Sequence, residues 1–221
     1  EIAKLVASDG GATDLFGCSV SISGTGSDAV AIIGTYGDDS FKGSSYIFDK
    51  SGGSWAQIDK LVASDGSSSD HFGYSVSISG TGNDAVAIIG ARGDDSSKGS
   101  AYIFDKSSGS WAQIAKLVAS DAANGDRFGV SVAISGTGND AVAIIGAEND
   151  DSYKGSAYIF DKSDGSWTEI AKLVASDAAS FKIFGNSVSI YGTGNNAVAI
   201  IGAISDDEYF LNSGAAYIFD K

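Results

Sequence analysis

The sequence contains no proline and no methionine, a single cysteine and a single histidine, and 14 basic residues against 28 acidic ones. One cysteine excludes an internal disulfide. No apolar run approaches the length of a membrane helix, since the longest is AVAIIGA at residues 85–91. The net charge of −14 argues against nucleic acid or an anionic membrane as a partner. The excess of carboxylates favours cations, basic partners or simple solubility instead.

Signatures of catalysis are also missing. The one histidine, His71, has no serine or cysteine in a recognisable triad arrangement, and the sequence contains no HExxH, nucleophile elbow or P-loop. Its aspartates recur at equivalent positions, which does not separate an acid from a base. Cys18 is replaced by Tyr74, Val130 and Asn186 in the other repeats, so a small buried hydrophobic residue is expected there. The sequence predicts a protein that is not an enzyme.

Internal repetition dominates the sequence. Phenylalanine followed by glycine recurs every 56 residues, and tryptophan keeps the same period: Phe16, Phe72, Phe128 and Phe184; Trp55, Trp111 and Trp167. The segments KLVASD, AVAIIG and YIFDK each occur four times. Together with 30 glycines, this pattern indicates short strands joined by tight turns.

Each unit predicts four strands. FGxSVSIS alternates apolar and polar residues, and AVAIIG is a continuous run typical of a strand covered on both faces. SAYIFDK alternates again, and WAQIAKLVA is a longer fourth candidate. The loops between them, of about five to ten residues, are too short for crossover helices. Each unit is therefore predicted to be an antiparallel meander without a helix.

A four-stranded antiparallel unit repeated end to end is typical of a propeller blade. The set FGxSV, IIGA, GSAYIF and Trp resembles the FG-GAP repeat, which builds the head propeller of integrin α-chains and many bacterial and algal surface proteins. The resemblance covers essentially the whole chain. It implies an all-β fold, a β-propeller of four-stranded antiparallel blades, and an extracellular or cell-surface location.

We expect one domain over residues 1–221, with repeats at about 1–57, 58–113, 114–169 and 170–221. The N-terminal segment EIAKLVASD matches the outer strand of a blade, and the C-terminal segment YIFDK matches the third strand of a blade. Residues 1–9 are therefore expected to complete the last blade and close a four-bladed ring. Such a ring has fewer blades than the family usually has. The alternatives are half of an eight-bladed ring made by a dimer, or a fragment cut in phase with the repeat.

Carboxylates gather in the loops predicted for one face of the propeller. Integrin-type repeats often carry a calcium loop between the first two strands, but here that loop reads GTGSD, GTGND, GTGND and GTGNN, too few carboxylates for Ca²⁺. The loop between the second and third strands and the segment joining two blades are acidic instead. The candidate metal ligands are Asp38, Asp39, Asp94, Asp95, Asp150, Asp151, Asp206 and Asp207, with Asp14, Asp70 and Asp126.

These carboxylates are expected to converge, and like charges repel unless a cation neutralises them. Ca²⁺ is the candidate cation, and no other cofactor is expected. The alternative is that each aspartate caps a turn through backbone N–H groups, with Lys42, Lys98 and Lys154 supplying the positive charge. The fourth repeat departs from the pattern, with Lys182 in place of the aspartate before FG and with Glu208 after its Asp pair.

Differences between the repeats collect on the same face. They fall just before FG, just after AVAIIG, at Phe41, Ser97 and Tyr153, and at a three-residue insertion in the last repeat. An exposed apolar cluster tends to mark a contact surface, although a longer loop can also drift without function. The candidate ligand contacts are Tyr36, His71, Arg92, Arg127, Glu148, Tyr209 and Phe210.

The predicted function is a non-enzymatic extracellular binding or adhesion module that uses this face and depends on calcium if the acidic loops hold it. A structural building block of a surface protein or filament and a glycan-binding lectin are the alternatives. The expected partners are a protein, a glycan or neighbouring copies of the chain, and neither nucleic acid nor a membrane interior.

Overall fold

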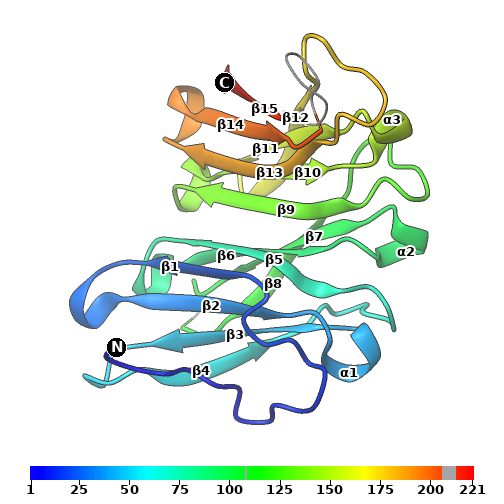
Figure 1. The fold of residues 1–221 in the computed structure, drawn as a ribbon. Helices are drawn as coiled ribbons and strands as arrows, with labels where there is room; N and C mark the ends of the chain where they lie inside the picture. Colours follow the sequence, from blue (N-terminus) through cyan, green and yellow to red (C-terminus); the bar gives the residue numbers. More distant parts are fainter. Residues whose placement is uncertain (108, 206–212) are drawn as a thin grey trace.

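The computed structural model describes residues 1–107, 109–205 and 213–221, and in these the chain is all-β (Figure 1). Four antiparallel sheets lie side by side in chain order, three with four strands and the last with three. The strands are β1 (Val20–Ser23), β2 (Val30–Thr35), β3 (Ser44–Asp49) and β4 (Ala56–Leu61); β5 (Phe72–Ser79), β6 (Val86–Ala91), β7 (Ser100–Asp105) and β8 (Ala112–Leu117); β9 (Phe128–Ser135), β10 (Val142–Ala147), β11 (Ser156–Ser163) and β12 (Ser166–Leu173); β13 (Phe184–Tyr191), β14 (Val198–Ala203) and β15 (Ala215–Asp220).

The strand assignment from hydrophobic pattern is confirmed. The AVAIIG strands lie second in each sheet, and all six residues of β2, β6 and β10 are buried. In the second sheet Ile88 pairs with Ser77 of β5 on one side and with Ile103 of β7 on the other. These strands are covered on both faces because each sheet packs against the next, so an alternating pattern would leave polar groups in the core.

Two kinds of short turn connect the strands. The GTGND loops form 3₁₀ turns: η1 (Gly26–Asp28), η2 (Gly82–Asp84), η3 (Gly138–Asp140) and η4 (Gly194–Asn196). The loops after the second strand form α1 (Asp38–Phe41), α2 (Asp94–Ser97) and α3 (Asp150–Tyr153), which lie together on the opposite side of the stack (Figure 1). Within α2, Asp95 and Ser96 have φ of 46° and 61°, so the element is a left-handed turn. No helix in the described part of the chain is long and apolar enough to span a membrane.

Close contact between neighbouring sheets explains the glycine of AVAIIG. A Cβ added to Gly90 would lie 2.0 Å from the carbonyl oxygen of Gly129 in the following sheet. The Gly34–Gly73 and Gly146–Gly185 pairs make the same approach. Any side chain at these positions would push two sheets apart, so the glycine sets the spacing of the stack.

The expected closure by the N-terminal strand is not what the structure shows, and this prediction is corrected. Residues 1–9 form no strand, and the last sheet pairs only β13, β14 and β15 within the described residues. The N-terminal segment lies beside the first sheet, where Leu5 and Ala7 pack against its core and the Ser8 amide donates to Gln57. The two termini lie at opposite ends of the stack (Figure 1). Local packing on the first sheet therefore replaces pairing with the last.

The expectation for Cys18 is also corrected. Its residue is exposed rather than buried, with Sγ 3.3 Å from the carbonyl oxygen of Gly73. Among the described residues no sheet lies before the first one to cover this position.

Candidate functional site

The acidic loops and the joining segments converge, as the repeat predicts. The amides of His71 and Phe72 donate to the carbonyls of Phe41 and Lys42 in the preceding sheet's loop. The amide of Gly93, in the following loop, donates to the carbonyl of Asp70. Each joining segment is thus held between the α turns of two neighbouring sheets. We call the surface made by α1, α2, α3 and these joining segments the α-turn face.

Lysine lies between the carboxylates that the sequence brings together. Lys116 Nζ, on β8, lies 2.7 Å from Asp94 Oδ2 and 2.6 Å from Asp65 Oδ2. Tyr102 donates its hydroxyl to the other oxygen of Asp65, and Ser100 donates to Asp94. The same group recurs around Lys60, with Asp9, Asp38, Tyr46 and Ser44, and around Lys172, with Asp121, Asp150, Tyr158 and Ser156. We call each of these a lysine node.

The lysine nodes shift the pKa values of their members in a consistent direction. Burial alone would raise the pKa of Asp65, but hydrogen bonds from Lys116 and Tyr102 outweigh it and hold that pKa below its usual value. Burial also opposes the charge on Lys116, whose pKa is nevertheless raised because Asp65 and Asp94 favour the ammonium. In the first node, burial raises the pKa of Tyr46 to about 12. At neutral pH each node therefore holds a charged lysine next to an ionised Asp9, Asp65 or Asp121.

These lysines were not predicted from the sequence. The balancing charge was expected from Lys42, Lys98 and Lys154, of which Lys98 and Lys154 pair with the exposed Asp95 and Asp151 in the same turn. The signal was present, because a lysine precedes LVASD in every repeat. It lies on the outer strand, next to the aromatic ring of the third strand, and only the cross-strand register shows that it reaches the acidic loop: Lys116 is opposite Tyr102.

The remaining acidic candidates serve as turn residues. Asp14, Asp70 and Asp126 each accept a hydrogen bond from a backbone amide three residues earlier, from Gly11, Ser67 and Ala123. Burial raises the pKa values of Asp70 and Asp126, and the neighbouring Asp94 and Asp150 add to the shift. Asp39 is exposed at its left-handed turn. Asp206 and Asp207 lie outside the described residues.

Calcium does not fit this arrangement. Within residues 1–107, 109–205 and 213–221, no three histidine, cysteine, aspartate or glutamate side chains gather where they could hold a metal ion. In α1, α2 and α3 the inner aspartate contacts the lysine of the outer strand, while the outer aspartate is exposed and, in α2 and α3, pairs with the lysine of its own turn. Ca²⁺ needs six to eight oxygens around one point. Binding of Ca²⁺ by these loops stays a prediction, which a titration of the protein with Ca²⁺ tests.

Three of the candidate ligand contacts converge on the α-turn face between the first and second sheets. Tyr36 lies with its ring 5.6 Å from His71 and 5.3 Å from Tyr74. Phe41 lies 5.7 Å from His71, and the Arg92 guanidinium is 3.8 Å from the centre of the Tyr74 ring. We call these five residues the aromatic cluster. Burial and the charges of Arg92 and Arg127 lower the pKa of His71, so the imidazole is neutral at pH 7.

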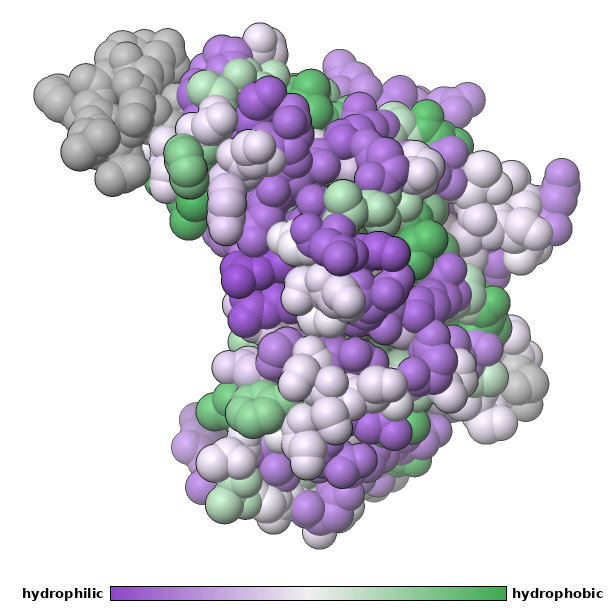
Figure 2. All heavy atoms as spheres, turned by 90° about the vertical axis from the view of Figure 1, so that its right-hand side faces the viewer, coloured by the Kyte–Doolittle hydropathy of each residue, from purple (hydrophilic) through white to green (hydrophobic). Residues whose placement is uncertain are grey.

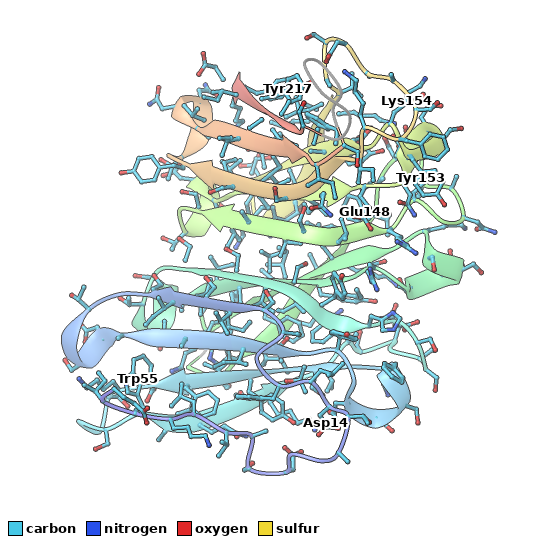
Figure 3. All side chains as sticks on the ribbon, viewed as in Figure 1. Asp14, Trp55, Glu148, Tyr153, Lys154 and Tyr217 are labelled. Atoms are coloured by element: carbon cyan, nitrogen blue, oxygen red, sulfur yellow. The ribbon has the colours of Figure 1, made fainter. Side chains whose placement is uncertain are left out.

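A second, more polar group lies between the third sheet and the last. Arg127 Nη1 is 3.2 Å from Glu148 Oε1, and Asn186 donates to Oε2 of the same glutamate at 2.8 Å. Nearby, Tyr153 stacks on Phe181 at 5.4 Å. Figure 3 shows Glu148, Tyr153 and Lys154 on the side of the stack that carries α3. Tyr209 and Phe210 lie outside the described residues, so their predicted contacts are not placed.

Left-handed backbone holds the variable residues of the α-turn face. His71, Arg127, Leu15 and Ile183, each just before FG, have φ between 58° and 61°. Phe41 and Tyr153, each ending an α turn, have φ of 63° and 65°. Bulky residues have unfavourable steric contacts in left-handed backbone conformations, and such strain tends to be kept at functional surfaces. Figure 2 looks onto this face, which is largely hydrophilic with scattered hydrophobic residues.

The opposite face carries a pocket of about 350 Å³ between the first and second sheets. It is lined by the GTGND loops and by Asp28, Asp49, Lys106 and Trp111. Its loops are nearly identical from repeat to repeat, which is the pattern of structural turns rather than of a surface that distinguishes a ligand. The variable residues lie on the α-turn face.

Comparison with known proteins places the chain in a family. A comparison with curated protein sequences finds no match. Among solved structures the fold is similar to Saccharomyces cerevisiae Sqt1, at 12% identity and a TM-score of 0.50, over 92% of this chain and 46% of that one. It is also similar to the GH43 endo-arabinanase from Bacillus licheniformis, at 12% identity and 0.50, over 91% and 70%. The chain thus spans less than half the length of the first, and at such identity the likeness concerns the fold alone. The model of the FG-GAP repeat matches residues 1–48, 55–104, 111–160 and 167–219, and the chain belongs to the FG-GAP repeat family.

Proposed function

We propose that the chain is a non-enzymatic binding module of an extracellular or cell-surface protein, with its sheets as blades of a β-propeller and its α-turn face as the binding surface. The aromatic cluster carries this proposal. Tyrosine and arginine dominate the energetics of protein interfaces, and here they gather where the repeats differ most. The ligand class that fits them best is a protein, with a glycan as the alternative.

The ordered backbone of the α-turn face supports the proposal that this face is a binding surface. Two residues of the aromatic cluster, Phe41 and His71, have left-handed backbone, and the amide of His71 donates to the carbonyl of Phe41. A ligand therefore meets side chains that are already ordered, which reduces the entropy cost of binding. The lysine nodes beneath, such as Lys116 with Asp94, fix each turn to the outer strand. Their role in this proposal is structural.

The residues also support the absence of catalysis. His71 lies among Tyr36, Phe41 and charged arginines rather than beside a serine or cysteine nucleophile, and its lowered pKa follows from burial. The contacts of its ring are those of a residue that packs among aromatic side chains. A general base would need a proton donor within hydrogen-bond reach.

The test compares two single-site variants with a matched variant on the opposite face. Arg92→Ala and Tyr36→Ser remove the two ends of the aromatic cluster, and Asn83→Ser changes a GTGND turn. Immobilised protein is exposed to an extract of cell-surface proteins and to a glycan array. We expect protein capture that falls at least tenfold in both cluster variants and is unchanged in Asn83→Ser. Equal capture by all variants contradicts the proposal, and glycan binding with the same sensitivity favours the lectin.

A further inference from the structure

Both arginines of the chain and its one histidine stand on the α-turn face, at positions where the repeats differ (Figure 2). They are Arg92, Arg127 and His71, and we call them the basic patch. At the equivalent positions the other repeats carry neutral or acidic residues: Leu15 and Ile183, and Tyr36, Glu148 and Ile204. In a chain of net charge −14, the basic patch is a local exception to the acidic surface.

His71 lies directly against the backbone that carries Arg92. A Cβ added to Gly93 would lie 2.9 Å from Nδ1 of His71, so the glycine makes room for the imidazole beside Arg92. The amide of Gly93 donates to the carbonyl of Asp70, the residue before His71. The charges of Arg92 and Arg127 both help to lower the pKa of His71. The three side chains therefore act on one small region of the face.

Arg92 is the arginine that lacks an acceptor. Its guanidinium lies 3.8 Å from the centre of the Tyr74 ring, and in the described part of the chain it makes no hydrogen bond and no ion pair. Arg127, by comparison, lies 3.2 Å from a carboxylate oxygen of Glu148. A guanidinium that rests on an aromatic ring keeps its N–H donors for an acceptor at its edge. Arg92 is thus charged and held in place, with its donors unused among the described residues.

The imidazole of His71 offers a second donor at the same place. Tyr36 and Phe41 meet it edge to face, with ring centres 5.6 and 5.7 Å away. Among the described residues its ring nitrogens have no hydrogen-bond partner. A neutral imidazole carries one N–H donor and one acceptor nitrogen. Aromatic packing therefore orients a donor beside the guanidinium without using it.

The surroundings of the basic patch favour a ligand with one negative charge rather than many. Asp39 and Asp95 are exposed on α1 and α2, the turns on either side of His71. They repel a chain that carries a charge on every unit, such as an acidic polysaccharide. Phe41 is 41% exposed and contacts His71, so an apolar group of the ligand can pack next to the charge. A carboxylate beside an apolar side chain matches both features.

We propose that Arg92 and His71 bind the carboxylate of an acidic residue in a protein ligand, and that Phe41 contacts an apolar side chain next to it. This inference rests on the proposed function of the α-turn face and names the chemistry of its ligand. The forked guanidinium matches both oxygens of a carboxylate. Because Tyr74 holds the guanidinium before the ligand arrives, less side-chain entropy is lost on binding.

A library of short random peptides tests this chemistry. Peptides are selected on the wild-type protein and counter-selected on Tyr36→Ser, so that those retained depend on the aromatic cluster. We expect them to share an aspartate or glutamate next to an aromatic or aliphatic residue. Retained peptides without an acidic residue would overturn this inference and leave the binding role of the face intact. If no peptide depends on Tyr36, the proposed function fails for protein ligands, and uronate binding on a glycan array that needs Arg92 would assign the patch to an acidic glycan instead.

A double-mutant cycle with a selected peptide locates its carboxylate. Arg92→Gln should weaken binding about tenfold, the size expected for a charge-assisted hydrogen bond. The peptide with an amide in place of its carboxylate should lose as much affinity for the wild type and nothing further on Arg92→Gln. Lys106→Gln removes the same charge from the opposite face and should bind like the wild type. Equal losses from the amide peptide on wild type and Arg92→Gln would overturn the pairing.

The donor role of His71 has its own test. His71→Phe keeps a ring between Tyr36 and Phe41 but removes the N–H. We expect about threefold to tenfold weaker binding of the acidic peptide, as for one lost hydrogen bond, and unchanged binding of its amide counterpart. Full affinity of His71→Phe for the acidic peptide would contradict this role.

Discussion

The ammonium of Lys116 lies 2.7 Å from the carboxylate of Asp94, and this contact joins the outer strand of the second sheet to the left-handed turn α2. Asp94 is buried, and its other partner is the hydroxyl of Ser100. Its sequence neighbour Asp95 is exposed and pairs only with Lys98 in the same turn. Two adjacent aspartates therefore have different roles, and substitution separates them.

Asp94→Asn should destabilise the protein by about 1–3 kcal/mol, because it leaves the half-buried Lys116 with one carboxylate and weakens a charge-assisted hydrogen bond. Asp95→Asn should change stability by less than about 0.5 kcal/mol, as expected for an exposed ion pair. Urea unfolding followed by tryptophan fluorescence measures both. Equal effects would show that the inner carboxylate is not part of the structural node.

Acid should weaken the lysine nodes. The pKa values of Asp9, Asp65 and Asp121 are held below the ordinary aspartate value by hydrogen bonds from lysine and tyrosine. A group whose pKa is depressed on folding stabilises the protein above its unfolded pKa and loses that contribution as the pH falls through the folded one. Stability should therefore fall from about pH 4 downward.

Two buried aspartates act in the opposite direction. The pKa values of Asp70 and Asp126 are raised, so the stability linked to their protonated forms is present below the unfolded pKa and is lost as pH rises through the folded one. Compared with the wild type, Asp70→Asn should therefore be relatively more stable at pH 7 than at pH 4. Asp65→Asn should lose less stability than the wild type when the pH falls below about 4. Thermal unfolding between pH 3 and 7 checks both, with Asp84→Asn in an exposed η2 turn as the control. Parallel curves for all variants would refute the assignment.

The repeat made most of the fold predictable. The period of FG, AVAIIG and YIFDK fixed the strand order and the side of the stack on which each loop lies, because every repeat must use the same contacts. The lysine nodes could not be read from spacing, since Lys116 and Asp94 meet only through the pairing of β8 with β7. The prediction that residues 1–9 complete the last blade was wrong for a different reason. Residues 1–9 can pack on the first sheet or pair with the last, and sequence similarity does not rank the two.

Glycine substitutions separate inner sheets from the end of the stack. Gly90→Ala should strongly destabilise the protein, by more than about 3 kcal/mol, because its Cβ would lie 2.0 Å from the carbonyl of Gly129. Gly202→Ala has the same local strand and the same serine neighbour, but no following sheet lies over it among the described residues, so the chain should fold with nearly wild-type stability. Circular dichroism melts at low protein concentration compare them. A large loss in Gly202→Ala alone would mean that β14 is already covered.

Calcium is the remaining alternative for the acidic loops, and the geometry gives a definite expectation. Asp94 Oδ2 already contacts Lys116, and Asp70 accepts a backbone amide, so a divalent ion in this loop would have to displace an ammonium and break a turn. A ligand that binds only the folded state stabilises it by about 2.7 kcal/mol at a hundred times its dissociation constant.

We expect 5 mM calcium to raise the melting temperature no more than sodium chloride at matched ionic strength, which controls for screening of the net charge of −14. The double variant Asp94→Asn with Asp95→Asn should respond to both salts alike, because it lacks the carboxylates that the calcium alternative requires. If calcium stabilises the wild type well beyond sodium, and the double variant loses that difference, the α2 loop binds the ion and the lysine must move aside. A calcium effect that survives in the double variant places the ion outside this loop.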